Sequence, residues 1–378
     1  MVPEKPPVVL LANTRWEALW EWSHILSTLF ANAGYPTVCV ETTGIRNPSL
    51  DAVTGRKVLR RLLSARSGGS KRESLPTNLT VYSPLVAPPT YGAFRRINRR
   101  LFVPRIIRNL RSLVGPAPVV MAFTPTRTTL DLVSRLEPRL VWYHCVLNYT
   151  EISGTPADMG ETELRLLEVA DTVTVDSGFL KEKHHRVRPD MIHIPSGVDF
   201  ELFRRADTGP LEAPARILYY AGAADDRRFD YDLVREIAGA GFTVRMLGTL
   251  SKPSFARTPG IEYLGEVPHK ALPQHLSKAD ALIIPYKITS FSKGTFPAKT
   301  YEYLATGKPV VATPLPDLEP LAKHIRLGDG AEEFVGILRR LHESETRENV
   351  CARVELAREN SWEARFARFE EILGKNLG

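Results

Sequence analysis

A lysine and a glutamate three residues apart, Lys299 and Glu302, have the clearest chemical potential in this sequence of 378 residues. Pro297 suits the first position of a helix, and Gly307 followed by Pro309 would end it. A cation in the first turn opposes the helix dipole, so its place needs another reason. An anionic ligand held by free N–H groups and the Lys299 ammonium would supply one, while Glu302 could accept hydrogen bonds from a sugar diol. A solvated ion pair on a surface helix is the alternative.

The run from Glu302 to Val311 resembles the nucleotide-sugar signature of GT-B glycosyltransferases, particularly family 4 and related bacterial envelope-polysaccharide enzymes. The resemblance implies that Glu302 binds the ribose of the donor nucleotide. Many members carry a second glutamate eight residues earlier, where this sequence has Gly294. The Pro-x-Lys-x-x-Glu-Tyr form found here is similar to the subgroup that includes teichuronic-acid and xanthan-type transferases.

The same resemblance points to a second loop at the donor. Gly222 follows the first expected strand of the second half of the chain, and Arg227 and Arg228 come shortly after it. In similar enzymes this glycine turn and its basic residues approach the phosphates. Two solvated arginines in a loop are the alternative.

Three further residues are expected to bind the donor. Lys293 lies on the loop at 287–296, and Gly265 with Val267 resembles the turn that borders the nucleobase. No Asp-x-Asp motif ends a strand, and the adjacent Asp225 and Asp226 read as a turn. Since positive side chains can stabilise a leaving diphosphate, we expect transfer without a metal or other cofactor, with the nucleotide-sugar as substrate.

An inverting transfer also needs a base that takes a proton from the acceptor hydroxyl. His144 follows the expected strand at 140–143 and should face the ligand, and Glu151 is the rival base. For the acceptor, Arg15 could meet an acidic or phosphorylated group and Trp16 could stack on sugar or lipid. A structural histidine and a tryptophan packed on the first helix are the alternatives.

Length and composition bound the class of protein. Apolar residues make up 43% and charged residues 25% of the chain, as in soluble globular proteins of two domains. Cys39, Cys145 and Cys351 lack metal-type spacing and are odd in number, which favours a reducing compartment. The neighbouring His184 and His185 are expected on a solvated basic helix. No signal-peptide core or membrane-length apolar run is present, so we expect a cytoplasmic protein.

Positive charge is concentrated in one region. Residues 51–150 hold 17 Lys+Arg against 4 Asp+Glu, in a chain of net charge +7. The runs at 56–63 and 95–111 read as basic amphipathic helices within 55–111, a pattern that suits an anionic membrane surface. Core-packed helices with solvated arginines are the alternative. Nucleic acid is disfavoured, because aromatic residues for base stacking are nearly absent from these runs.

The elements that must position these residues are parallel strands joined by helices. Buried runs predict strands at 8–12, 38–41, 80–83, 119–122, 140–143, 172–175 and 191–194, then at 216–221, 243–247, 261–264, 281–284 and 310–312. We therefore predict an α/β fold of two doubly wound Rossmann-like domains facing a cleft, the GT-B arrangement. The domains are expected at 1–203, for the acceptor, and 204–360, for the nucleotide-sugar. A helix at 361–378 should pack back on the first.

Together these observations predict a glycosyltransferase, a hexosyltransferase, that serves polysaccharide or glycoconjugate biosynthesis. It would transfer sugar to a lipid-linked or membrane-associated acceptor, or to a carbohydrate, as a peripheral protein on the inner face of the cell membrane. A nucleotide-sugar epimerase of the same fold and a non-catalytic sugar-nucleotide or polymer binder are the alternatives. The sugar, the nucleobase, the acceptor, the stereochemical outcome and the oligomeric state stay open.

Overall fold

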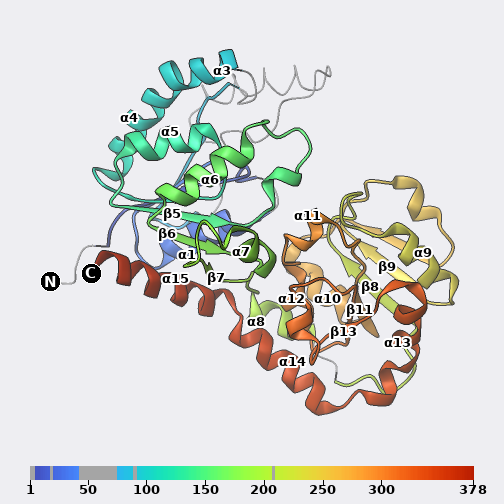
Figure 1. Cartoon of the computed structure of the whole chain (residues 1–378). Coiled ribbons are helices and arrows are strands. Elements are labelled where there is room, and N and C mark those ends of the chain that lie inside the picture. Colours follow the sequence, from blue (N-terminus) through green and yellow to red (C-terminus); the bar gives the residue numbers. More distant parts are fainter. Residues whose placement is uncertain (1–4, 18–19, 42–74, 88–91, 207–208) are drawn as a thin grey trace. The chain divides into compact units, whose positions relative to one another are not determined.

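A computed structural model describes residues 5–17, 20–41, 75–87, 92–206 and 209–378 (Figure 1). The chain divides into two compact units. The first holds residues 1–175, 180–193 and 373–378, and the second holds residues 176–179 and 194–372. Each unit is described by itself.

The first unit is built on a seven-stranded sheet in which every recorded strand pair is parallel, in the order β3-β2-β1-β4-β5-β6-β7. Its strands are β1 (Val8–Leu11), β2 (Thr37–Val40), β3 (Leu79–Tyr82), β4 (Val119–Ala122), β5 (Leu140–Cys145), β6 (Thr172–Val175) and β7 (Ile192–His193). All residues of β1, β2, β4, β5 and β6 are buried. Because both faces of a parallel sheet are covered, β1 and β4 are continuous apolar runs, and the threonines of β6 are buried as well.

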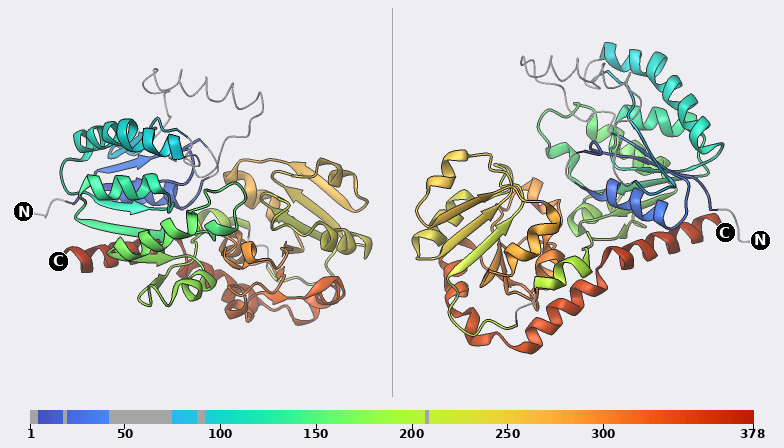
Figure 2. Two further views of the ribbon diagram at one scale, coloured as in Figure 1. Left: turned by 45° about the horizontal axis from the view of Figure 1, so that its top comes forward. Right: turned by 180° about the vertical axis from the view of Figure 1, so that it is seen from behind.

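Helices of the first unit connect these strands. They are α1 (Trp22–Asn32), α3 (Gly92–Ile97), η1 (Asn98–Phe102), α4 (Val103–Val114), α5 (Arg127–Leu136), η2 (Tyr149–Glu151), α6 (Met159–Val169) and α7 (Gly178–His184). Thr126 begins α5 by accepting a hydrogen bond from the Thr129 amide, and Gly115 ends α4. The views in Figure 2 show the sheet between layers of helices.

The second unit repeats the pattern in a six-stranded sheet, again with every recorded pair parallel, in the order β10-β9-β8-β11-β12-β13. Its strands are β8 (Ile217–Ala221), β9 (Thr243–Leu247), β10 (Ile261–Gly265), β11 (Ala281–Ile284), β12 (Val310–Ala312) and β13 (Arg326–Leu327). In both sheets the winding direction reverses beside the first strand, between β1 and β4 and between β8 and β11. Open α/β sheets bind ligands at the carboxyl ends of the strands that flank such a reversal.

Around the second sheet lie α8 (Phe200–Phe203), η3 (Arg204–Ala206), α9 (Tyr231–Gly239), η4 (Pro253–Arg257), η5 (His269–Ala271), α10 (Leu272–Leu276), α11 (Ser290–Lys293), α12 (Lys299–Ala305), η6 (Glu319–Leu321), α13 (Gly330–Ser344) and α14 (Arg347–Glu359). The last helix of the chain is α15 (Trp362–Leu377). Asp230 caps α9 by accepting from the amides of Asp232 and Leu233. One apolar core joins sheet and helices, with Tyr219, Ile283 and Phe334 almost fully buried in it.

The predicted α/β class of two doubly wound domains is confirmed. The expected strands form, and β13 is a short edge strand that the sequence did not reveal. The chain divides after His193, before the predicted boundary at 203, and α15 is shared: residues up to Ile372 group with the second unit and Leu373–Gly378 with the first.

The two basic runs have different outcomes. The run at 56–63 lies outside the described residues. The run at 95–111 forms the consecutive helices α3, η1 and α4, with Pro104 near the start of α4. Among the described residues, no helix combines the length and the apolar character that crossing a membrane requires.

Candidate functional site

The reversal in the second sheet brings three elements together. Gly222 follows β8 directly, Tyr286 follows β11, and Lys299 is the first residue of α12. Gly222 has φ +133°, and a Cβ at this position would lie 2.8 Å from Lys299 Nζ. A side chain here would displace the ammonium, so glycine allows the cation to approach the strand end.

Aromatic rings hold the Lys299 ammonium. Nζ donates a hydrogen bond to the Tyr286 hydroxyl at 2.9 Å and lies 3.9 Å from the ring centroid of Tyr220. Tyr303, also fully buried, accepts a hydrogen bond from the Ala221 amide at 2.8 Å. A cation–π contact is strongest where water is excluded, as it is here. The lysine is therefore a pre-positioned buried cation rather than half of a solvated surface pair.

The electrostatics of this cluster favour an incoming anion. Lys299 is only 9% exposed, and burial lowers the pKa of its ammonium while Tyr286 partly offsets that effect. For Tyr286, burial acts to raise the pKa, but the cations of Lys299 and Arg228 outweigh it and the pKa is lowered. A phosphate beside Lys299 would restore the charged form of the lysine, since an opposite charge counters desolvation.

Helix α12 differs in one respect from its prediction. Pro297 precedes the helix instead of opening it, its carbonyl accepting from the Thr300 amide at 2.9 Å. Gly307, at φ +71°, does take the left-handed conformation predicted to end it. Arg353 of α14 donates to the Gly307 carbonyl at 2.7 and 3.0 Å and pairs with the nearly buried Glu345. The carboxyl end of α12 is thereby anchored to α14.

Glu302 has a partner that the sequence did not reveal. Its Oε1 lies 2.9 Å from Nε2 of His269, which begins η5 just after the turn containing Gly265 and Val267. This hydrogen bond raises the pKa of His269 above its usual value. Gly265 has φ +81° and accepts from the Gly248 amide, and Val267 is half-buried. The only sequence signal for His269 was its place after the expected nucleobase turn.

The two arginines share one carboxylate. Arg228 Nε donates to Asp225 Oδ2 at 2.6 Å, and Arg227 Nε lies 3.4 Å from Asp225 Oδ1. Burial acts to raise the pKa of Asp225, but Arg228 outweighs it and the pKa is lowered. Both guanidinium groups lie over the Phe291 ring of α11. Arg228 is half-buried by these contacts, whereas Arg227 stays exposed, so the alternative of a solvated arginine fits only Arg227. Lys293 ends α11 half-buried.

The histidine expected as a base is not at a strand tip. His144 lies inside β5, fully buried, with Nδ1 2.8 Å from Thr174 Oγ1 and its ring 4.4 Å from the ring of Trp22. Burial lowers the pKa of His144 to about 3. The expected exposure to the ligand is therefore wrong, and the structural alternative fits. Glu151, the rival base, is exposed at the end of η2.

The two residues predicted to bind the acceptor differ in their exposure to solvent. Arg15 is exposed. Trp16 is 8% exposed: its amide donates to Glu41 Oε1 at 2.9 Å, and its ring packs edge-on against Trp20 and His24. The structure thus favours the alternative in which Trp16 packs on the first helix, since a buried ring cannot stack on an acceptor.

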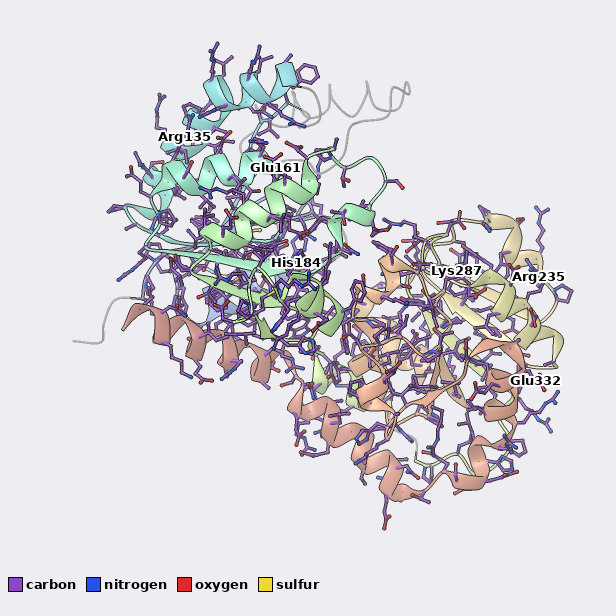
Figure 3. The ribbon with its side chains drawn as sticks, in the orientation of Figure 1. Arg135, Glu161, His184, Arg235, Lys287 and Glu332 are labelled. Atoms are coloured by element: carbon purple, nitrogen blue, oxygen red, sulfur yellow. The ribbon has the colours of Figure 1, made fainter. Side chains whose placement is uncertain are left out.

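His184, expected on a solvated helix face, is only 5% exposed at the end of α7 (Figure 3). Burial, followed by the charge of Lys183, lowers its pKa to about 4. The expectation of solvation is wrong for His184 and right for its neighbour His185, which is exposed.

Part of the chain matches a known protein family. Residues 225–343 match the model of the family described as glycosyl transferases group 1. A protein named for teichuronic acid biosynthesis, the glycosyltransferase TuaH of Bacillus subtilis strain 168, is 28% identical over 178 residues. That match covers 43% of this chain and 45% of the relative, so it spans less than half of the relative's length.

Solved structures share the fold across both units. Sucrose-phosphate synthase from Thermosynechococcus elongatus gives a TM-score of 0.67 at 16% identity, over 98% of this chain and 99% of that one. A mutant of TarM of S. aureus, solved with fondaparinux, α-GlcNAc-glycerol and UDP, gives a TM-score of 0.61 at 9% identity, over 99% and 100%. At such identities the likeness shows the fold alone. The predicted GT-B fold is confirmed, whereas the family 4 features stay a prediction.

Proposed function

The second unit carries a group 1 glycosyltransferase domain within a GT-B fold, and from this premise we propose that the chain is a glycosyltransferase acting on a nucleotide-diphosphate sugar. The observation that carries the proposal is the Lys299 ammonium held against Gly222 at the sheet reversal. A diphosphate at the carboxyl end of β8 would meet this cation, with Arg228 close enough to act on the charge of Lys299. Lys293, Gly265 and Val267 stay predicted donor contacts.

Charge stabilisation is the proposed chemistry. The leaving nucleotide diphosphate gains negative charge as the bond to the sugar breaks, and preorganised cations in a site of low dielectric stabilise it. Lys299 and Arg228 supply these cations, so the proposed transfer uses no metal or other cofactor. Glu302 would accept hydrogen bonds from the ribose hydroxyls while its Oε1 stays hydrogen-bonded to His269. Of the two predicted bases, the exposed Glu151 is the better candidate.

The proposed acceptor is a lipid-linked or membrane-associated saccharide of an envelope polysaccharide. Support comes from α3, η1 and α4, whose arginines alternate with exposed apolar side chains: Phe94, Ile97, Leu101 and Leu113. Such a surface can insert apolar groups between lipids while its cations meet anionic headgroups. The name of the Bacillus subtilis relative supports a cell-envelope polymer. We place the chain on the cytoplasmic face of the membrane.

Lys299→Met tests the donor site. Methionine keeps the length of the side chain but removes the ammonium, so affinity for a nucleoside diphosphate should fall at least about tenfold, as expected for a lost charged hydrogen bond. Glu302→Gln should weaken binding by a smaller factor. Isothermal titration calorimetry, with the diphosphate first chosen by thermal-shift screening, measures both.

The exposed Lys323 of the same unit provides the control, and Lys323→Met should bind normally. If Lys299→Met and Glu302→Gln both bind like the wild type, the donor site lies elsewhere. Conversion of the free donor sugar without any acceptor would instead identify an epimerase.

Vesicle binding tests the membrane proposal. The full chain should sediment with vesicles containing phosphatidylglycerol and less with purely zwitterionic ones, and salt should weaken binding. A surface basic residue contributes about 1 kcal/mol, so Arg100→Glu should reduce partitioning at least about fivefold. Leu101→Asp should also reduce it, because Leu101 is 65% exposed. The exposed Leu264 of the second unit gives the control Leu264→Asp, and equal partitioning of all three variants would contradict the proposal.

A further inference from the structure

Three potential metal ligands converge inside the first unit. Cys145 belongs to β5, Glu163 to α6 and His184 to α7, and one donor atom of each lies within 4.8 Å of the others. All three residues are buried: Cys145 fully, Glu163 at 1% exposure and His184 at 5%. This cluster is separate from the donor-site residues, which belong to the second unit.

The contacts around Glu163 leave one of its oxygens directed at the histidine. Oε1 accepts from the Tyr143 hydroxyl at 2.9 Å and lies 3.8 Å from Cys145 Sγ. Oε2 lies 3.6 Å from His184 Nε2 and 3.9 Å from Lys183 Nζ. Tyr143 thus orients the carboxylate, the role that hydrogen-bonded neighbours of metal ligands commonly have.

A second observation concerns the histidine itself. Within the described part of the chain, His184 Nε2 is buried and has no hydrogen-bond partner. At 3.6 Å from Glu163 Oε2 it is too far for a hydrogen bond. A buried polar atom without a partner costs about 1–3 kcal/mol, and coordination to an ion would remove that cost.

We propose that Cys145, Glu163 and His184 bind a divalent transition-metal ion, with Zn²⁺ as the expected occupant. One sulfur, one nitrogen and one oxygen are the donors that zinc accepts, at about 2.0–2.3 Å from the metal. Donor atoms around one such ion lie about 3–4 Å apart, and the three donor atoms here all lie within 4.8 Å of one another. Three protein ligands leave one tetrahedral position for water or a small ligand.

The ion also balances the charge of the cluster. Metal binding takes the deprotonated thiolate and carboxylate together with a neutral imidazole, and it releases protons. The positive charge of Lys183 repels a cation at this site. However, the Lys183 ammonium donates a hydrogen bond to Asn148 Oδ1 at 2.6 Å, and this contact fixes its position. The site would link β5, α6 and α7, and it is independent of the proposed metal-free transfer in the second unit.

Metal analysis of the purified full chain tests the inference. After loading with Zn²⁺ alone and dialysis, we expect close to one bound zinc per chain and an increase in melting temperature. With Co²⁺ alone, a thiolate-to-cobalt charge-transfer band should report the Cys145 bond. Cys145→Ser should abolish this band, and Cys145→Ser and His184→Gln should each weaken metal affinity at least about tenfold.

Matched controls come from the same unit. Cys39 is a second buried cysteine and His185 an exposed neighbour of His184, so Cys39→Ser and His185→Gln should bind like the wild type. Lys183→Met should strengthen binding by removing the opposing charge. The inference is overturned if wild-type protein retains no zinc, or if Cys145→Ser keeps the cobalt band. Equal loss in His185→Gln and His184→Gln would also overturn it, since this would indicate surface binding.

Discussion

The two sheets reverse their winding in the same way, yet the turns at the two reversals differ in content. After β8, Gly222 leaves the space that the Lys299 ammonium enters. After β1, Asn13 donates to Glu21 Oε2 at 2.6 Å and Trp16 is buried against its neighbours. One turn is therefore occupied by a cation that an anion can pair with, and the other by an aromatic ring that is part of the core. A shared strand order does not make two equivalent binding sites.

The largest expected effect concerns the turn after β1. If Trp16 is a core residue, Trp16→Ala should destabilise the first unit by about 3–5 kcal/mol in urea unfolding, because a large buried ring is lost. Trp20, which is 57% exposed, is the matched control, and Trp20→Ala should cost about 1 kcal/mol or less. If Trp16→Ala instead lost transferase activity at unchanged stability, the predicted role of Trp16 in acceptor binding would be restored. The contrast between the turns after β1 and β8 would then be weaker.

A substitution at Gly248, which packs against the Gly222 turn after β8, should disturb that turn. Gly248 has φ +112°, and a Cβ there would lie 2.3 Å from the Gly222 carbonyl oxygen. Gly248→Ala should therefore cost about 1–3 kcal/mol of stability and weaken nucleotide binding by displacing Gly222.

A variant at Gly265 serves as the control that distinguishes the cost of backbone strain from the cost of a steric clash. Its φ is +81° but nothing lies within 4 Å of an added Cβ, so Gly265→Ala should cost only about 1–2 kcal/mol. Urea unfolding and calorimetry measure both variants. Equal effects at the two glycines would show that close packing behind the Gly222 turn is unimportant.

The smallest expected effect concerns the His269–Glu302 pair. Because the pKa of His269 is raised in the folded chain, the pair's stabilisation is complete below the unfolded value near 6.5 and is lost as pH rises through the folded pKa. For a partly exposed pair we expect about 0.5 kcal/mol. His269→Gln should remove this pH dependence, measured by urea unfolding at about pH 5.5 and about pH 8.5. His185→Gln should keep it, and an unchanged profile in His269→Gln would contradict the pairing.

The sequence was sufficient to predict those structural features that depend on a single segment of the chain. Continuous apolar runs predicted central strands such as β1, β4 and β11, because a strand buried on both faces of a parallel sheet is mostly apolar. Gly307 and Pro309 predicted the end of α12, since only local backbone conformation is involved. Gly222 and Lys299 were each expected at the donor from short motifs, although their mutual contact was not.

The failures share a cause. His144 and His184 were assigned to exposed positions from their immediate neighbours, but burial depends on elements distant in the chain: Trp22 packs on one, and Glu163 lies beside the other. The partner of Glu302, His269, is separated from it by a strand and two helices. Such contacts leave no periodic signal for a sequence to show.

By itself, the sequence determined the two doubly wound sheets, the glycines that turn the chain, and the lysine and glutamate of α12, because these follow from hydrophobic pattern and backbone conformation. Only the tertiary structure decided that the Lys299 ammonium is buried among tyrosines, that Trp16 belongs to the core, and that Cys145, Glu163 and His184 meet. Those outcomes depend on which side chains crossover connections bring together, and therefore on distances in space rather than along the chain.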